Sequence, residues 1–221
     1  MELNEILSLC DHTLLSQSAT WDEIKQTLDD AIVYSTASAC IPPDFVSRAA
    51  EYANGRVKIC TVIGFPNGYS KSEVKAYEAS LAAADGADEI DMVINIGMLK
   101  EKRYSDLLAE INSVKAAVGD RILKVIIEAC LLTEEEKIKA CEIVSASNAD
   151  FIKTSTGFST GGATPEDIAL LSRHTVGKRV KAAGGIKTVS DAENFIALGA
   201  SRLGTSRLVG IAKKQMENSG Y

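Results

Sequence analysis

Two lysines stand at the ends of two successive strand-like segments of this sequence. Lys153 follows the apolar residues of "ADFIKTSTGF", and Lys181 comes just before the glycine pair of "KRVKAAGGI". A lysine that is partly buried beside another ammonium group loses its proton more easily, and a neutral amine can attack a carbonyl carbon. The pair therefore indicates Schiff-base chemistry.

Carboxylates and a hydroxyl occur on earlier segments of the same kind. In "DEIDMVIN", Asp91 shares one face with Glu89, while the apolar residues between them would face the other way. Asp11 and Thr13 share a face of "DHTLL" in the same manner. If these segments are strands of one barrel, the polar groups converge with the two lysines at its mouth.

The elements that must position these residues form a regular alternation. Short apolar segments predict strands at 11–15, 36–41, 57–65, 88–95, 122–130, 150–155, 179–186 and 201–206; helical periodicity predicts helices at 21–34, 43–53, 72–86, 104–119, 133–147, 165–177, 189–199 and 207–218. This order is typical of a parallel (β/α)8 TIM barrel, an α/β fold. We expect one domain over residues 1–221, with a short N-terminal helix and a flexible polar C-terminal tail. A doubly wound sheet is the alternative, although the glycine-rich loop expected after its first strand is missing.

The composition excludes several classes of protein. A net charge of −6 argues against a broad surface for nucleic acid, and no apolar run is long enough to span a membrane. The first residues carry no Lys or Arg, so we expect neither a signal nor a transit peptide, and we expect a cytoplasmic protein. The five cysteines show no paired spacing, which indicates reduced thiols.

Two loops have the features of a phosphate site. Gly184 and Gly185 permit close backbone approach before a helix, and Gly204, Thr205 and Ser206 precede the last helix. Backbone amides after the last two strands of a barrel commonly bind phosphate. Helix capping is the alternative for each loop alone, but their adjacency favours phosphate.

Metal-dependent chemistry is weakly supported, and we expect neither a metal nor another cofactor. The chain has two histidines, whereas a catalytic zinc would normally need about three. His12 lies on the strand face opposite Asp11, as a core residue would. Cys40 is expected near the pocket without acting as a nucleophile, and Lys58 and Lys124, near the starts of their strands, are expected to be structural ion-pair partners.

Seven segments taken together resemble the strand motifs of deoxyribose-phosphate aldolases. They are "DHTLL", "TVIGFPNG", "GADEIDMVINIG", "LKVIIEACLLT", "DFIKTSTGF", "VKAAGGIKT" and "LGASRLGTS", in this order through nearly the whole chain. The resemblance implies a metal-free class I aldolase, a lyase of deoxyribonucleotide catabolism. Such an enzyme reversibly cleaves 2-deoxy-D-ribose 5-phosphate to acetaldehyde and D-glyceraldehyde 3-phosphate.

The resemblance also implies roles for individual residues. Lys153 would be the Schiff-base nucleophile, Lys181 the neighbour that lowers its pKa, and Asp91 a proton-transfer residue working with water. Many family members read "GTSSG" where this chain has Arg207, which could bind phosphate or point into solvent. The expected substrate-binding residues are Asp11, Thr13, Cys40, Thr154, Gly184, Gly185, Gly204, Ser206 and Arg207.

Several alternatives remain open at this stage. A barrel isomerase or epimerase of a sugar phosphate would use the carboxylates without a covalent bond, and a regulatory protein would bind phosphate without catalysis. The expected partners are a sugar phosphate and aldehydes, and a homodimer is one alternative for the assembly. Tyr221 at the chain end could fold back and assist proton transfer, with Asp91 and water as alternatives.

Overall fold

The chain forms a closed barrel of eight parallel strands in sequential order, as expected from the alternation of segments. The computed structural model describes residues 1–219, and the side chains of 1–217. The strands are β1 (Cys10–Thr13), β2 (Ser38–Ile41), β3 (Ile59–Ile63), β4 (Glu89–Val93), β5 (Ile122–Ile126), β6 (Phe151–Lys153), β7 (Arg179–Ala183) and β8 (Ala200–Thr205). Pairing of β1 with β8 closes the sheet.

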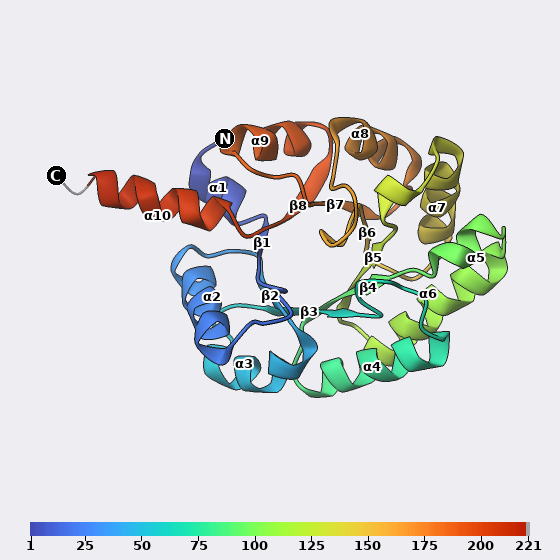
Figure 1. The fold of residues 1–221 in the computed structure, drawn as a ribbon, viewed down its shortest axis with the longest axis horizontal. Helices are drawn as coiled ribbons and strands as arrows, with labels where there is room; N and C mark the ends of the chain where they lie inside the picture. The colour runs from blue at the N-terminus through green and yellow to red at the C-terminus, as the bar shows by residue number, and fades with distance from the viewer. Residues whose placement is uncertain (220–221) are drawn as a thin grey trace.

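Helices surround the strands in the plane of Figure 1, and α10 extends outward beside α1. They are α1 (Leu3–Leu7), α2 (Trp21–Val33), α3 (Val46–Ala53), α4 (Ser72–Ala84), α5 (Ile96–Lys100), α6 (Tyr104–Val118), α7 (Glu134–Ala146), α8 (Pro165–His174), α9 (Val189–Ala197) and α10 (Leu208–Ser219), with short 3₁₀ turns at Pro43–Phe45 and Ala129–Leu131. In the described residues, no helix is long and apolar enough to cross a membrane.

Several strands are shorter than the sequence predicts, and glycine explains two of the differences. The expected strand at 57–65 ends at Ile63 because Gly64 has φ +58°, and the strand at 179–186 ends at Ala183 because Gly184 and Gly185 have φ +73° and +80°. Positive φ is incompatible with a continuing strand. The loops therefore begin earlier and leave more backbone at the barrel mouth.

The alternation of side chains along the strands produces two buried regions, an apolar layer between the sheet and the helices and a charged region inside the barrel. Ile90 and Met92 of β4 are fully buried in the apolar layer between sheet and helices, whereas Glu89 and Asp91 are fully buried inside the barrel. This agrees with the expected faces of the segment. The apolar layer supplies the hydrophobic stabilisation, and the barrel interior is free to hold charged groups.

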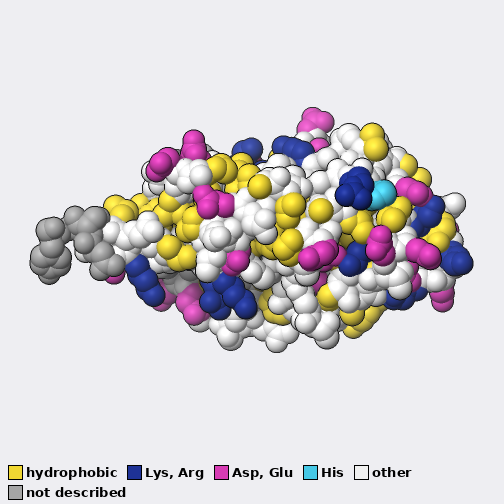
Figure 2. All heavy atoms as spheres, turned by 90° about the horizontal axis from the view of Figure 1, so that it is seen from above, with side chains coloured by type: hydrophobic (Ala, Val, Ile, Leu, Met, Phe, Trp, Pro, Cys, Tyr) yellow, Lys and Arg dark blue, Asp and Glu magenta, His cyan; other side chains and the backbone are white. Residues whose placement is uncertain are grey.

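The outer surface carries mixed charges. On the face shown in Figure 2, Lys and Arg side chains are interspersed with Asp, Glu and apolar side chains. The net charge of the whole chain is −6.

A buried ion pair joins α4 to α6 outside the barrel. Lys75 Nζ donates to Glu110 Oε1 at 2.9 Å and to the Val93 carbonyl at 2.8 Å, and Glu110 also accepts from Asn95 N. Both side chains of the pair are fully buried. Burial lowers the pKa of Lys75, and Glu110 partly opposes this. The pair thus ties two helices to the end of β4.

Removing one partner of this pair should destabilise the fold strongly. Glu110→Leu leaves the Lys75 ammonium buried without its carboxylate, so we expect the free energy of unfolding to fall by about 3–5 kcal/mol. Urea unfolding followed by circular dichroism measures this. Glu142→Leu on the exposed face of α7 is the control, since its partner Lys139 is solvated. A loss below about 1 kcal/mol for Glu110→Leu would contradict the assigned importance of the pair.

Candidate active site

Asp91 is the common acceptor of three lysines inside the barrel. Lys153 Nζ and Lys181 Nζ both donate to Asp91 Oδ2 at 2.7 Å, and Lys124 Nζ donates to Oδ1 at 2.8 Å. The lysines come from β6, β7 and β5, next to one another in the sheet. The three residues singled out first in the sequence, Asp91, Lys153 and Lys181, are therefore in direct contact.

The network continues across the barrel through Asp11 of β1. Lys181 Nζ donates to Asp11 Oδ2, while Arg202 Nη1 and Ser38 Oγ donate to Oδ1 at 2.6 and 2.8 Å. Glu89 closes the network by an ion pair with Lys124 at 2.7 Å and by accepting from Arg202 Nη1 at 2.9 Å. The carboxylates thus lie between cations contributed by four strands.

The network fixes the charges of its deepest members. Burial would raise the pKa of Asp91, but Lys124, Lys153 and Lys181 hold it well below its usual range. Burial would likewise lower the pKa of Lys181, yet Asp11 and Asp91 raise it above its usual value. Asp91 is therefore a carboxylate and Lys181 an ammonium throughout the neutral range.

The network contains more cations than anions. It has three carboxylates and four basic groups, namely Asp11, Glu89 and Asp91 with Lys124, Lys153, Lys181 and Arg202. With every group ionised, one positive charge is in excess. Loss of one proton from a lysine amine would bring the network to neutrality. This is favourable because a buried net charge is costly.

Lys153 differs from the other cations of the network because it lines a cavity. A cavity of about 440 Å³ opens at the barrel mouth, and among the described residues Lys153 is the one basic member of the network that lines it. The other lining residues are Thr13, Leu14, Leu15, Ser16, Thr156, Gly157, Phe158, Ala183, Gly184, Gly185, Ile186, Lys187, Gly204, Thr205, Ser206 and Arg207. Of the cations in the network, Lys153 is thus the one that borders a ligand in this cavity.

The expected phosphate loops lie along the same cavity. Gly184, Gly185 and Gly204 line it, and Ser206 and Arg207 lie at the exposed rim before α10. A Cβ atom on Gly162 would come within 2.6 Å of the Gly184 carbonyl carbon, so two loops pack backbone against backbone here. The glycine loops, Arg207 and Lys153 thus line one cavity.

The remaining expected substrate-binding residues have different surroundings. Thr13 lines the cavity, whereas Cys40 is buried with its Sγ within 4.8 Å of an Asp91 carboxylate oxygen. The Thr154 hydroxyl accepts from Ala183 N and contacts the Ala183 carbonyl oxygen, which joins β6 to β7. Asp11 reaches the site through Lys181 and is fully buried.

The expectations for three basic residues have different outcomes. His12 is a buried core residue, 3.7 Å from Asp30, as expected. Lys124 is an ion-pair partner as expected, but its Nζ reaches Asp91 and so joins the candidate active site. Lys58 is exposed just before β3, and no ion pair joins it to another described residue, so that expectation is wrong.

Arg202 is a member of the network that sequence analysis missed. It lies on β8 two residues before Gly204, so the same alternation that placed Asp91 could have placed its side chain inside the barrel. Its guanidinium contacts both Asp11 and Glu89. Tyr221, expected to contribute from the tail, lies outside the described residues.

Two groups of side chains have donor atoms close enough to ligate a metal ion. They are Cys40, Cys60 and Asp91, and Asp11, Cys60 and Glu89. Their carboxylates already accept from ammonium or guanidinium groups. A divalent cation would therefore have to enter against several positive charges, and neither group fits a metal well.

Comparisons with known proteins agree with this geometry. The family model "DeoC/LacD family aldolase" matches residues 6–211. A deoxyribose-phosphate aldolase from Streptococcus agalactiae is 56% identical over 221 residues, covering 100% of this chain and 99% of that protein. One from Clostridioides difficile is 55% identical, covering 96% and 98%.

Solved structures show the same similarity. The deoxyribose phosphate aldolase of Aeropyrum pernix, described as tetrameric, superimposes with a TM-score of 0.88 at 30% identity, over 98% of this chain and 93% of that one. An aldolase called QR15 superimposes with a TM-score of 0.92 at 35% identity, over 97% of each chain. The similarity covers the barrel from β1 to β8.

Proposed function

The chain belongs to the DeoC/LacD family of aldolases, and we propose that it reversibly cleaves 2-deoxy-D-ribose 5-phosphate to acetaldehyde and D-glyceraldehyde 3-phosphate. The relatives that are 55–56% identical carry the name of this activity. The observation that carries the proposal is the sharing of Asp91 Oδ2 by Lys153 and Lys181 beneath a cavity lined by Lys153.

Lys153 is the Schiff-base nucleophile in this proposal. Its amine lines the cavity, and loss of its proton removes the excess positive charge of the network. The neutral amine attacks C1 of the aldehyde, and loss of water gives an iminium. Lys181 is the fixed cation that favours the neutral form of Lys153, because the two groups share one carboxylate oxygen.

Asp91 is the proton-transfer residue. As a buried carboxylate in contact with Lys153, it can accept the proton of the C3 hydroxyl through a water molecule as the C2–C3 bond breaks. The electrons of that bond enter the iminium and give an enamine, which an unmodified aldehyde would accommodate much less well. Protonation at C2 and hydrolysis then release acetaldehyde and restore Lys153.

The glycine loops bind the phosphate in this arrangement. Gly184, Gly185 and Gly204 present backbone at the cavity, and Arg207 supplies a guanidinium at its rim. Because these groups and Lys153 line one cavity, a phosphorylated sugar can span both ends. Binding energy from the phosphate then positions C1 at the amine.

Trapping with borohydride tests the function directly. The protein mixed with acetaldehyde and borohydride should acquire one reduced adduct, located on Lys153 by peptide mass spectrometry. The assay is paired with acetaldehyde release from deoxyribose 5-phosphate, with and without a chelator. Release without any adduct would favour a non-covalent isomerase-type reaction, and loss of release with the chelator would require a metal.

Ser206→Glu should separate phosphorylated from unphosphorylated substrate. A carboxylate at the cavity rim repels the phosphate dianion at a cost of about 2–3 kcal/mol, so kcat/KM for deoxyribose 5-phosphate should fall by roughly 100-fold. The same constant for deoxyribose should change little. Ser113→Glu on the exposed outer face of α6 is the matched control. Equal losses for both substrates would place the phosphate elsewhere.

We also propose a cytoplasmic enzyme of deoxyribonucleotide catabolism that works on small molecules as a homodimer. All five cysteines are free thiols, which suits a reducing compartment. Similarity to a relative described as tetrameric supports the proposal that this protein associates. Light scattering after size-exclusion chromatography measures the assembly, and a monomer at micromolar concentration would contradict it.

A further inference from the structure

Glu128 has an unusual backbone conformation directly after β5. Its φ of +50° lies in the left-handed region, which is unfavourable for a residue with a side chain. Of the four described non-glycine residues with positive φ, it alone is buried; Ser35, Asn54 and Lys102 are exposed turn residues. A strained conformation at a buried position persists where surrounding contacts hold it in place.

The Glu128 carboxylate is held mainly by Thr156, with a weaker contact from the Cys130 thiol. Both of its oxygens accept from Thr156 N, at 3.2 and 3.3 Å, and Oε2 also accepts from Thr156 Oγ1 at 2.5 Å. Cys130 Sγ lies 4.0 Å from Oε1. Among the described residues, no basic side chain forms an ion pair with Glu128. A buried carboxylate needs its donors, so Glu128 and Thr156 are tightly coupled.

Thr156 passes this contact on to Phe158. The Thr156 hydroxyl donates to Glu128 and accepts from Phe158 N at 3.0 Å. Phe158 has 48% of its surface exposed, so packing alone holds it weakly. Its ring meets that of Phe65 edge-on, with centroids 5.3 Å apart. The backbone bond from Phe158 to Thr156 therefore helps to set the position of the ring.

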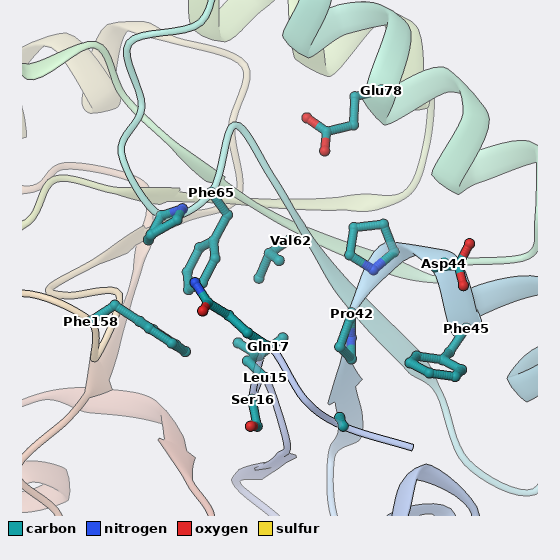
Figure 3. A pocket seen from close by; sticks show the side chains of 13 residues that line it. Leu15, Ser16, Gln17, Pro42, Asp44, Phe45, Val62, Phe65, Glu78 and Phe158 are labelled. Carbon is teal, nitrogen blue, oxygen red and sulfur yellow. The ribbon is translucent and has the colours of Figure 1, made fainter. Parts of the chain in front are cut away.

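Phe158 lies between two cavities. It lines the cavity that holds Lys153, and it also lines a second cavity of about 460 Å³. In Figure 3, Phe158 extends toward Gln17 below Phe65, with Pro42 and Phe45 on the opposite side of the second cavity. The ring is therefore part of the boundary between the two spaces.

The other end of the same loop is anchored independently. Gly162 packs against the backbone of Gly184 and Gly185, where the expected phosphate site lies. Loosening the bond between Thr156 and Glu128 would therefore release Phe158 while leaving this second anchor in place. Phosphate binding and the position of Phe158 are separable.

We propose that Glu128 is a positioning residue that, through Thr156, holds Phe158 as the wall between the catalytic cavity and the second cavity. The proposal rests on the aldolase function proposed above. The wall limits the size of the aldehyde that can meet the Lys153 enamine. It thereby favours the small phosphorylated acceptor over bulky apolar acceptors.

The test compares two acceptors in the addition direction. The ratio of kcat/KM for hydrocinnamaldehyde to that for glyceraldehyde 3-phosphate, both with acetaldehyde as donor, is measured in wild type, Glu128→Gln, Thr156→Val and Phe158→Ala. Glutamine keeps the volume of Glu128 but offers one oxygen acceptor to the two Thr156 donors. Each variant should raise the ratio by about tenfold, as expected for a lost wall of a substrate pocket.

The controls distinguish positioning from general damage. Glu142→Leu, on the exposed face of α7, is remote from the contacts between Glu128 and Thr156 and should keep the wild-type ratio. The double variant of Glu128 and Phe158 should shift the ratio no further than Phe158→Ala alone. Unchanged ratios in Glu128→Gln, or parallel losses with both acceptors together with a lower Tm, would overturn the proposal. Failure of the aldolase function itself would appear separately, as no borohydride adduct on wild-type Lys153.

Discussion

Lys153→Ala is expected to lower cleavage of deoxyribose 5-phosphate by roughly four orders of magnitude or more, since removal of a covalent nucleophile leaves only binding and electrostatic effects. Among the described basic groups of the network, only Lys153 lines the cavity. Lys124 or Lys181 could replace Lys153 only by breaking its own ion pairs with buried carboxylates. Acetaldehyde release and borohydride trapping measure the two consequences, lost turnover and lost adduct.

The matched control for this variant is Lys58→Ala, which removes an exposed lysine just before β3. It should keep full activity and the adduct. Circular dichroism and Tm must show that Lys153→Ala is folded; because removal of this cation leaves Asp91 with two lysines, we expect a folded barrel. An adduct of normal stoichiometry in Lys153→Ala would refute the assignment of the nucleophile.

Lys181→Leu should move the activity to alkaline pH. Burial would lower the pKa of Lys181, but Asp11 and Asp91 raise it, so wild type keeps a cation beside Lys153 over the whole assay range. Without that cation, the network is neutral with all of its remaining groups ionised, so its net charge no longer favours loss of a proton. We expect the pH of half-maximal activity to rise by about two units, with a loss of roughly 100-fold at neutral pH.

Recovery at high pH separates this role from structural damage. If the nucleophile is intact but protonated, activity should rise as the pH is raised toward the alkaline limit of stability, and the adduct on Lys153 should form there. A misfolded variant would lack both at every pH. A Lys181→Leu variant with the wild-type pH profile would show that Lys181 does not control the protonation of Lys153.

Local periodicity was enough to predict which segments form strands, the order of those strands and the faces of their side chains. The alternation of charged and apolar residues in "DEIDMVIN" predicted that Asp91 faces the barrel interior, and the strand-end position of Lys153 predicted its place near the mouth. The same expectation for Lys181 is wrong, because Lys181 lies in the middle of β7 and is fully buried. These properties depend on local periodicity, because a side chain on a strand has only two faces to choose between. The loop at the glycine pair 184–185 could likewise be predicted from the local sequence.

The contacts between charged side chains inside the barrel depend on the tertiary structure. Arg202 of β8 and Glu89 of β4 are partners although they come from strands far apart in the sheet, because their side chains cross the closed barrel. Strand tilt and register set such contacts, and no local pattern in the sequence specifies them.

Loop conformation was also beyond the sequence pattern. Glu128 was part of an expected strand at 122–130, but the strand ends at Ile126 and Glu128 turns inward to bind Thr156. That contact and the approach of Phe158 to Phe65 join loops that follow different strands. They depend on the three-dimensional neighbours of each loop, because an irregular segment has no periodicity from which its partners could be predicted.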